Sequence, residues 1–307
     1  MRNAFAESLI ELFKKDSKRI LLVGDIGNRL FDNLKFNSPN SFLNCGISEA
    51  NMTGVAAGLA LCGYRPITYT ITPFNTLKCI EQIKVDICYQ NLPVTIVGTG
   101  SGLSYSSFGI THQSLDDLAI MKTMPNLTIL CPSTPNEVRM IIKNLNKIKG
   151  PVYIRLGKKG EKEYFQKFSS NYNFLKPYSV IKGSEICILN IGHALEISYD
   201  LANLINSKKK MKKASLYNIT SVKPINVNFL KKISKKYKKI FIIEEHGRQG
   251  SIFESISSIY KELDIYNLKV YGVNTPDKIN SCLGSQRDAR SKLNLDPYKI
   301  AKKYKLI

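Results

Sequence analysis

The chain has 307 residues, of which 43% are hydrophobic and 22% charged, so it can fold as two ordinary domains or one large one and is not a disordered chain. Its 45 Lys and Arg residues against 24 Asp and Glu residues give a net charge of +21. Many of the lysines flank apolar residues at helical spacing, as in the runs at 208–210 and 231–239, which is typical of solvated helix faces. We therefore expect no nucleic-acid partner.

The apolar runs and the cysteines of the sequence also limit where the protein can be located in the cell. No apolar run reaches the roughly 18 to 20 residues needed to span a bilayer, and residues 1–16 have the pattern of an amphipathic helix, not of a secretory signal. The seven cysteines form no Cys-x-x-Cys pair, which argues against a disulfide framework or a zinc ribbon. We expect a cytoplasmic protein with no membrane partner and no metal ligands of its own.

Strands and helices alternate along the first half of the chain. Helices are expected at 3–15, 48–62, 74–90, 114–123 and 136–145, and strands at 20–23, 67–70, 93–98, 127–130 and 152–156. This alternation predicts a doubly wound parallel α/β domain over residues 1–157. The polar, unperiodic segment 158–178 is the expected linker.

The alternation restarts after this linker. Strands are expected at 186–190, 214–219, 240–243 and 268–271, and helices at 192–207, 226–237 and 250–262. A second, smaller α/β domain is therefore predicted over residues 179–307.

Two segments could carry chemistry. Glu49 follows Ser48 at the start of a helix of small residues, and an acid there is favoured by the helix macrodipole. Glu49 could therefore cap its helix or act as a buried carboxyl that shares a proton with a ligand nitrogen. A Gly-rich loop over 98–109 leads to His112, and such a loop lets a ligand approach the backbone closely. The sequence leaves His112 open as either a surface contact or a ligand contact.

Taken in order, several motifs resemble the C-terminal half of transketolases. They are Gly46-Ile47-Ser48-Glu49-Ala50-Asn51-Met52, Thr111-His112-Gln113, Met124-Pro125-Asn126 and, near a later strand end, Glu244-Glu245-His246-Gly247. The resemblance covers essentially the whole chain. It implies a pyrimidine-binding domain of a thiamine diphosphate enzyme followed by a transketolase C-terminal domain, with transfer of a two-carbon ketol unit from a ketose donor to an aldose acceptor.

The resemblance also implies roles for single residues. Glu49 matches the glutamate that hydrogen-bonds N1′ of the aminopyrimidine and so promotes deprotonation of the thiazolium C2. Phe74 matches an aromatic that stacks on this ring, Ile71 stands where a second aromatic is usual, and Asp25 matches an acidic position near the cofactor. His112 matches the histidine that contacts the oxygens of the sugar.

One family signature is absent from the sequence. In the resembling enzymes, a Gly-Asp-Gly motif and a later Asn in the N-terminal half hold the diphosphate and its metal ion. Here Gly24-Asp25 continues with Ile26, and no such motif follows. The ligands of Mg²⁺ or Ca²⁺ are therefore expected on a separate N-terminal subunit, in an α2β2 assembly that binds thiamine diphosphate between its chains.

The substrate side departs from the resemblance as well. Phe108, in Ser106-Ser107-Phe108-Gly109, stands where the family has an acid that reads sugar hydroxyls, and Lys158 stands where an arginine grips the acceptor phosphate. Lysine binds phosphate as a point charge without a bidentate fork. We therefore expect the substrate to differ from the ordinary pentose phosphates, as a modified, nucleotide-linked or non-phosphorylated sugar would.

Two other functions stay open at this point. The chain could be the β-type subunit of a 2-oxo acid decarboxylating dehydrogenase or a pyruvate-dependent synthase, which share the domain pair and the helix-mouth glutamate. It could also be a catalytically decayed interaction subunit. The Thr111-His112-Gln113 segment favours the transketolase alternative, and the presence of both Glu49 and His112 argues against decay.

Overall fold

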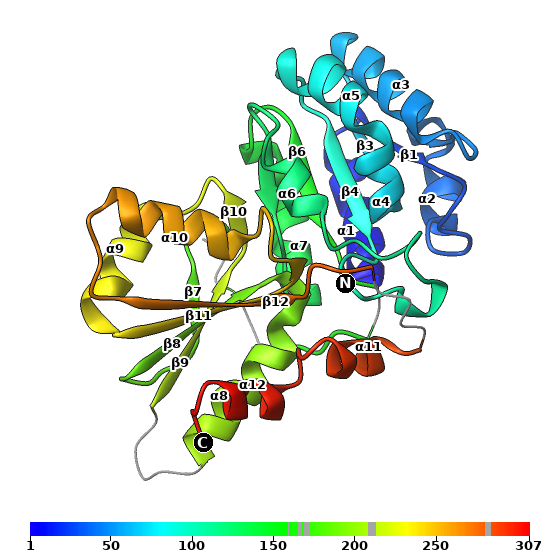
Figure 1. The fold of residues 1–307 in the computed structure, drawn as a ribbon. Coiled ribbons are helices and arrows are strands. Elements are labelled where there is room, and N and C mark those ends of the chain that lie inside the picture. Colours follow the sequence, from blue (N-terminus) through cyan, green and yellow to red (C-terminus); the bar gives the residue numbers. More distant parts are fainter. Residues whose placement is uncertain (159, 165–167, 169–171, 208–212, 280–283) are drawn as a thin grey trace. The chain divides into compact units, whose positions relative to one another are not determined.

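The computed structural model describes residues 1–307 except 159, 165–167, 169–171, 208–212 and 280–283 (Figure 1). Its internal contacts divide the chain into unit 1, residues 1–101 and 120–172, and unit 2, residues 102–119 and 173–307. The lysine run at 208–210 and part of the expected linker 158–178 lie outside the described residues. Both units have the predicted α/β architecture, and no helix in the described part of the chain is long and apolar enough to cross a membrane.

Unit 1 is built on parallel strands that pair in the order β5-β6-β4-β3-β1-β2. The strands are β1 (Arg19–Val23), β2 (Phe42–Asn44), β3 (Arg65–Ile71), β4 (Thr95–Thr99), β5 (Thr128–Leu130) and β6 (Val152–Arg155). The helices are α1 (Arg2–Lys15), α2 (Asp32–Asn37), α3 (Glu49–Leu61), α4 (Thr72–Asn75), α5 (Ile80–Gln82) and α7 (Pro135–Lys143). A further helix, α6 (Asp117–Met121), follows the Gly-rich loop.

The order of these strands creates a reversal point. The chain passes from β1 to β2 on one side and returns to β3 on the other side of β1. In open α/β sheets such a reversal leaves a crevice at the carboxyl ends of the two strands, and ligands bind there. We therefore expect the crevice of unit 1 where β1 ends at Val23 and β3 ends at Ile71.

An aromatic cluster fixes β3 from the inside of unit 1. Tyr69 is fully buried, stacks on Phe5 of α1 at 5.5 Å between ring centroids, and meets Phe31 edge-on at 4.9 Å. Such pairs add to the free energy gained by burying the rings. The carboxyl end of β3 is thus held by the core.

Unit 2 has a sheet with the strand order β12-β11-β8-β9-β7, in which only the edge strand β7 runs antiparallel to its neighbour. Its strands are β7 (Tyr178–Ile181), β8 (Ile186–Ile191), β9 (Ala214–Ile219), β11 (Lys239–Gly247) and β12 (Lys269–Thr275), with a short β10 (Ser221–Lys223). Its helices are α8 (Leu195–Ser207), α9 (Val227–Lys236), α10 (Ile252–Glu262), α11 (Gln286–Lys292) and α12 (Pro297–Lys303). The strand order reverses between β8 and β11, which places a second crevice at their carboxyl ends.

The helix predicted over 74–90 is interrupted. It consists of α4, a 3₁₀ turn at Leu77–Cys79, α5 and a π-helical segment at Ile83–Tyr89. Thr76, with φ −127° and ψ −80°, lies outside the helical region and separates α4 from the turn. This break places Lys78 on a turn, where its side chain contacts α3.

Candidate active site

The predicted site residues of unit 1 gather at one edge of its sheet. Asp25 follows the end of β1, Glu49 follows the end of β2, and Ile71 ends β3. Because these strands are parallel neighbours, their carboxyl ends meet at the same edge. Phe74, half-buried on α4, lies just beyond β3, and Lys158 follows β6 at the same edge.

Glu49 is the first residue of α3 and is only 2% exposed. Lys78 donates to its Oε2 over 2.7 Å, and the side chain of Lys78 is half exposed. In the described part of the chain no backbone amide of α3 donates to the Glu49 carboxylate, so capping does not account for its position. A buried carboxylate at the mouth of a helix, held by a single half-exposed cation, is placed to exchange that partner for a ligand atom.

The contact with Glu49 also changes the pKa of Lys78. The hydrogen bond from Lys78 to Glu49 and the negative charge of Glu49 raise the pKa of the Lys78 ammonium. Lys78 therefore remains charged beside this carboxylate at neutral pH. Its sequence context offers no motif that would have predicted the contact.

The crevice between β1 and β3 lies directly against Glu49. A Cβ at Gly24 would stand 3.2 Å from the Thr70 Cβ and 3.3 Å from the Glu49 Cγ, so only glycine fits there without a shift of its neighbours. The Thr70 hydroxyl is buried and finds no hydrogen-bond partner among the described residues. A buried hydroxyl without a partner is destabilising unless a ligand or water satisfies it, so the crevice is suited to a polar ligand.

Asp25 is locked to the neighbouring strand end. It adopts a left-handed conformation with φ 52°, its amide donates to Asn44 Oδ1 over 3.2 Å, and Asn44 Nδ2 donates to its Oδ1 over 3.1 Å. Asn44 Oδ1 also accepts from the Gly46 amide over 3.0 Å. The exposed carboxylate of Asp25 is thereby fixed beside the turn that leads to Glu49.

His112 lies in unit 2 on the segment 102–119, which we call the His112 loop. Its Nδ1 is 2.9 Å from the Thr111 hydroxyl, and its ring stacks on Phe108 at 5.1 Å between centroids. Phe108 is 59% exposed and Tyr105 closes the group edge-on. Gln113 is 4% exposed, and neither atom of its amide has a hydrogen-bond partner among the described residues.

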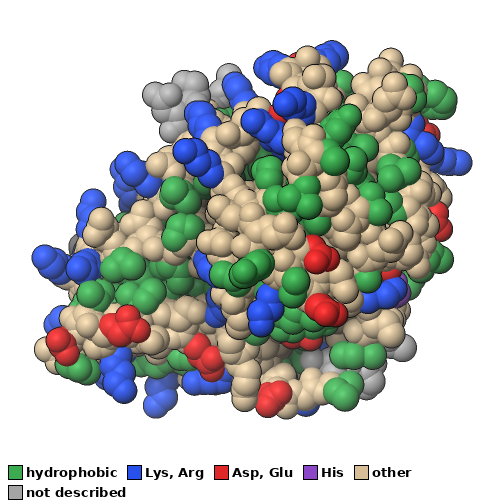
Figure 2. Space-filling model, turned by 90° about the horizontal axis from the view of Figure 1, so that it is seen from above, with side chains coloured by type: hydrophobic (Ala, Val, Ile, Leu, Met, Phe, Trp, Pro, Cys, Tyr) green, Lys and Arg blue, Asp and Glu red, His purple; other side chains and the backbone are tan. Residues whose placement is uncertain are grey.

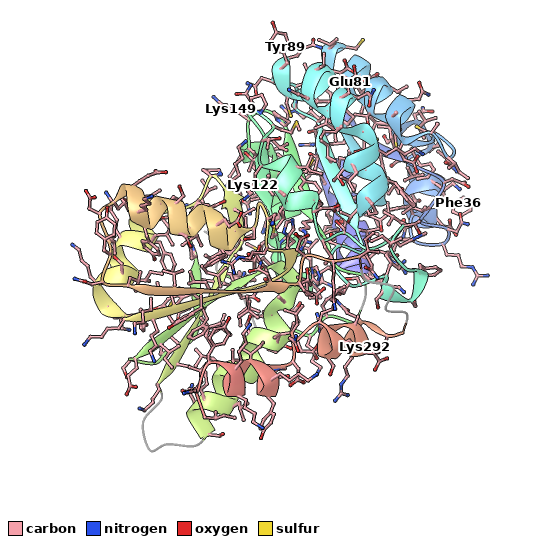
Figure 3. The ribbon with its side chains drawn as sticks, viewed as in Figure 1. Phe36, Glu81, Tyr89, Lys122, Lys149 and Lys292 are labelled. Carbon is pink, nitrogen blue, oxygen red and sulfur yellow. The ribbon has the colours of Figure 1, made fainter. Side chains whose placement is uncertain are left out.

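Several large apolar side chains are exposed on or beside α3 and the π-helical segment of unit 1. The face of the molecule seen from above, on which α3 and α5 lie in Figure 1, carries gathered hydrophobic side chains (Figure 2). Tyr89 is 81% exposed and projects from the end of the π-helical segment (Figure 3), and Ile47 before α3 is 78% exposed. Leu61 and Val85 are also largely exposed. We call Ile47, Leu61, Val85 and Tyr89 the α3 face.

Comparison with known proteins identifies the family. Residues 1–160 match the transketolase pyrimidine-binding domain, and residues 179–296 match the transketolase C-terminal domain. The chain belongs to the transketolase family. This membership confirms the resemblance seen in the sequence.

One relative of this transketolase-family chain is a subunit of the apulose-4-phosphate transketolase from Phocaeicola vulgatus, with 26% identity over 98% of this chain and 95% of the relative. The solved structure of a split-gene transketolase, an inactive β4 tetramer, superposes with a TM-score of 0.85 and 27% identity over 98% of this chain and 95% of that chain. The transketolase of Campylobacter jejuni shares the fold at a TM-score of 0.78 and 15% identity, and the match covers 99% of this chain but 46% of that chain.

Transketolase-family membership implies dependence on thiamine diphosphate, and the structure allows a test of fit. The aminopyrimidine half fits unit 1, because a buried carboxylate, a glycine without room for a Cβ and an unpartnered hydroxyl meet at the crevice. For the diphosphate half, no group of three or more His, Cys, Asp or Glu side chains is placed to hold a metal ion in the described part of the chain. The residues at the crevice therefore fit the aminopyrimidine half.

Proposed function

We propose that this chain is the C-terminal subunit of a split, thiamine diphosphate-dependent transketolase. A separate N-terminal subunit supplies the diphosphate and Mg²⁺ or Ca²⁺ site, and the two assemble as α2β2. The observation that carries the proposal is the buried Glu49 carboxylate at the crevice between β1 and β3. The near-complete coverage of the apulose-4-phosphate transketolase relative, which is itself one subunit of its enzyme, supports the split arrangement.

The residues of unit 1 would hold the aminopyrimidine. When bound, thiamine diphosphate supplies a nucleophilic carbon that cleaves the bond beside a ketose carbonyl and carries the two-carbon unit. Glu49 would hold and move a proton at N1′ of the aminopyrimidine. The N1′ atom would take the position beside the carboxylate that Lys78 occupies in this chain. Phe74 and Ile71 would form an aromatic wall and an aliphatic wall, and Asp25 would fix the turn beside the ring.

The residues of the His112 loop would handle the sugar. His112, oriented by Thr111 and by the stacked Phe108 ring, would contact the donor oxygens, and the unpartnered Gln113 amide would be satisfied nearby. The apolar ring of Phe108 against His112 cannot accept hydrogen bonds from sugar hydroxyls as a carboxylate does. Lys158 would contact a substrate phosphate through its charge alone. We therefore propose a ketose other than the ordinary pentose phosphates.

The α3 face is the proposed contact with the N-terminal subunit. Four large apolar side chains are exposed on or beside α3 and the π-helical segment, which pack on each other. A Cβ at Gly54 or Gly58 of α3 would meet nothing within 4 Å, so neither glycine is needed for packing within the chain. Glu49 begins the same helix, so a chain docked there would lie against the cofactor site.

A calorimetric titration tests the proposal. Thiamine diphosphate with Mg²⁺ is titrated into this chain alone, and then into its mixture with a candidate polypeptide that carries the Gly-Asp-Gly motif. We expect tight binding only in the mixture, and the Glu49→Gln variant should abolish ketol transfer while leaving assembly intact. Glu11→Gln, at an exposed carboxylate on α1, is the matched control and should retain activity.

The substrate that the mixture turns over distinguishes this proposal from its alternatives. Turnover of hydroxypyruvate by the mixture supports ketol transfer, whereas turnover of pyruvate would show a decarboxylating dehydrogenase or synthase. Cofactor binding by this chain alone would disprove the split arrangement. Assembly without cofactor binding would show a decayed interaction subunit.

A further inference from the structure

The carboxyl end of β11, residues Glu244-Glu245-His246-Gly247, is buried except for its last residue, and it has no place in the proposed chemistry. Glu244 has a structural role of its own, since its carboxylate accepts from the Ile252 and Phe253 amides over 3.1 and 3.0 Å at the start of α10. The other three residues of this motif contact the His112 loop.

Glu245 holds the start of that loop. Its Oε2 accepts from the Leu103 amide over 2.9 Å and lies 2.8 Å from His193 Nε2, which must carry the proton because a carboxylate only accepts. Gln286 of α11 donates to both carboxylate oxygens over 3.1 and 3.2 Å and lies 3.4 Å from the hydroxyl of Ser104 in the loop. Glu245 therefore joins the loop, the turn that follows β8, and α11 at one point.

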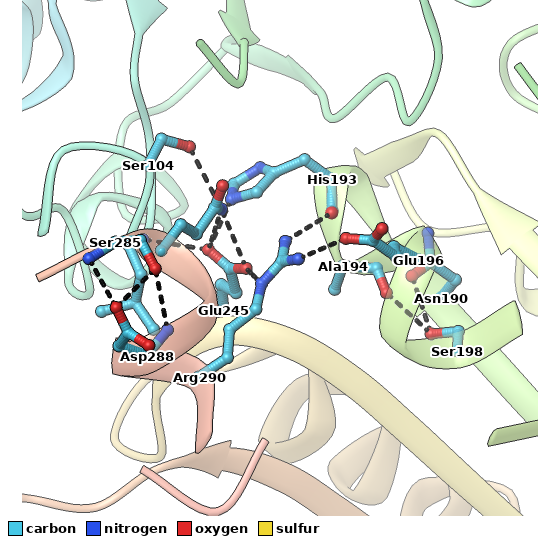
Figure 4. A network of polar contacts seen from close by, with 12 residues as sticks. Ser104, Asn190, His193, Ala194, Glu196, Ser198, Glu245, Ser285, Asp288 and Arg290 are labelled. Carbon is cyan, nitrogen blue, oxygen red and sulfur yellow. Dashed lines mark hydrogen bonds and ion pairs between the residues drawn. The ribbon is translucent and has the colours of Figure 1, made fainter. Parts of the chain in front are cut away.

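Arg290 balances the charge of this buried group. Figure 4 shows its guanidinium between two carboxylates: Nε donates to Glu245, and Nη1 donates to Glu196 over 2.8 Å. Nη2 donates to the His193 carbonyl over 3.2 Å. Burial by itself would raise the pKa of Glu245, but the charges of Arg290 and His193 and the Leu103 amide hold it well below its usual range. These contacts therefore favour the ionised form of the Glu245 carboxyl.

The far end of the loop is held by the rest of the motif. The Gly247 amide donates to the Leu115 carbonyl over 2.6 Å, and the Ala119 amide donates to His246 Nε2 over 3.3 Å. Gly102 and Ser114 form a two-bond bridge that closes the segment between them, with both bonds at 3.0 Å. The part of the loop that carries His112 is therefore a ring fastened at both ends to one strand.

The packing around Gly102 at the start of the loop leaves no room for a larger side chain. A Cβ at Gly102, which has φ +63°, would stand 2.6 Å from Glu245 Oε2 and 2.7 Å from His193 Nε2. This point is the reversal between β8 and β11, where open α/β sheets ordinarily bind a ligand. In unit 2 the chain's own loop fills that position.

We propose that Glu245, with Arg290 and His193 behind it, is a positioning residue that sets the place of His112 for contact with the sugar donor. The clamp itself rests on the contacts above, and its consequence for the donor rests on the proposed function. A misplaced histidine raises the KM for the donor in every molecule. Loss of folded protein, by contrast, lowers only the number of active sites and leaves KM unchanged.

The first test is hydrogen exchange of the full chain, compared between Glu245→Gln and the control Glu244→Gln. Loss of a charge-assisted contact should speed exchange of the amides at 103–108 by roughly tenfold or more in Glu245→Gln. Glu244→Gln should instead speed exchange at 252–255 and leave the His112 loop as it is. Unchanged exchange at 103–108 in Glu245→Gln would overturn the proposal. If Glu245→Gln does not fold, Gln286→Ala against its exposed neighbour Arg287→Ala gives the same comparison.

The second test is steady-state kinetics of the complex with the N-terminal subunit and hydroxypyruvate as the donor. We expect Glu245→Gln to raise KM by roughly tenfold and Glu244→Gln to keep KM within about twofold of the unsubstituted complex. Faster loop exchange with an unchanged KM would overturn the positioning role. If the unsubstituted complex transfers no ketol unit, the proposed function fails, and the exchange experiment still decides whether Glu245 clamps the loop.

Discussion

The ammonium of Lys78 lies 2.7 Å from the Glu49 carboxylate, and the two residues are 29 positions apart in the sequence. The carboxylate is almost wholly buried and the ammonium is half exposed. The Lys78 side chain can therefore turn into solvent, whereas the buried Glu49 side chain cannot. If Glu49 binds a ligand nitrogen as we propose, Lys78 is therefore the partner that would give way.

The pKa of Lys78 should consequently report on Glu49. The hydrogen bond and charge of Glu49 raise it, so we expect it to fall toward its ordinary value in Glu49→Gln and on binding of thiamine diphosphate to the assembled complex. Reductive ¹³C-methylation followed by an NMR pH titration measures it, with the signal assigned through Lys78→Arg. Glu11→Gln should leave the signal in place. An equal titration in Glu49→Gln and the unsubstituted chain would show that the pair does not form.

Gly24→Ala should damage the crevice directly. The new Cβ would crowd Thr70 at 3.2 Å and Glu49 at 3.3 Å, so we expect a loss of about 1 to 3 kcal/mol in the free energy of unfolding. Urea unfolding followed by circular dichroism measures this change. Gly58→Ala is the matched control: its Cβ meets nothing within 4 Å, and alanine in a helix should stabilise the chain by up to about 1 kcal/mol. Equal stability of the two variants would refute the crowding at Gly24.

The sequence predicted the elements that a periodic pattern specifies. The buried strands and amphipathic helices of both units occur where apolar spacing places them, and their ends differ by a few residues. It did not predict β2, which is three residues long, or α2, α11 and α12, which have six or seven residues each. The edge strand β7 was missed as well. Elements this short contain too few residues to show a period.

The candidate site was predictable only in part. Motif resemblance singled out Glu49 and His112, but Lys78 has no motif, and its contact depends on how the turn after α4 packs against α3. The contacts of the His112 loop were not predictable either. The Leu103 amide donates to Glu245, which is 142 residues away, and such contacts group the loop with unit 2. Contacts between residues so distant in sequence follow from topology and leave no local signal.

Phe108→Ala tests the stacked pair at His112. Aromatic pairs contribute about 0.5 to 1.5 kcal/mol, so we expect kcat/KM for the donor to fall by roughly two- to tenfold as His112 loses its orientation. The free energy of unfolding should hardly change because Phe108 is mostly exposed. Steady-state kinetics of the complex measure the effect, with Ser107→Ala as a control beside it on the same exposed turn. A kcat/KM that is unchanged in Phe108→Ala would exclude the ring from donor handling.

Acid should weaken the chain partly through Glu245. Its folded pKa is depressed by Arg290 and His193, against the opposing effect of burial, so as the pH falls the unfolded chain takes up the proton first. The stabilisation by Glu245 is therefore complete well above its ordinary pKa of 4.5 and is lost progressively below that value.

We accordingly expect Glu245→Gln to unfold at lower urea than the unsubstituted chain at pH 7, because breaking a buried pair costs about 3 to 5 kcal/mol. The gap should narrow as the pH falls from 5.5 to 3.5. Arg290 is the main charge that lowers the pKa of Glu245. Adding Arg290→Met to the unsubstituted chain should therefore remove much of the pH dependence of its unfolding free energy. Adding the same substitution to Glu245→Gln should change that pH dependence little. A stability gap that stays constant between pH 7 and 3.5 would mean that Glu245 is not held as an anion by this network.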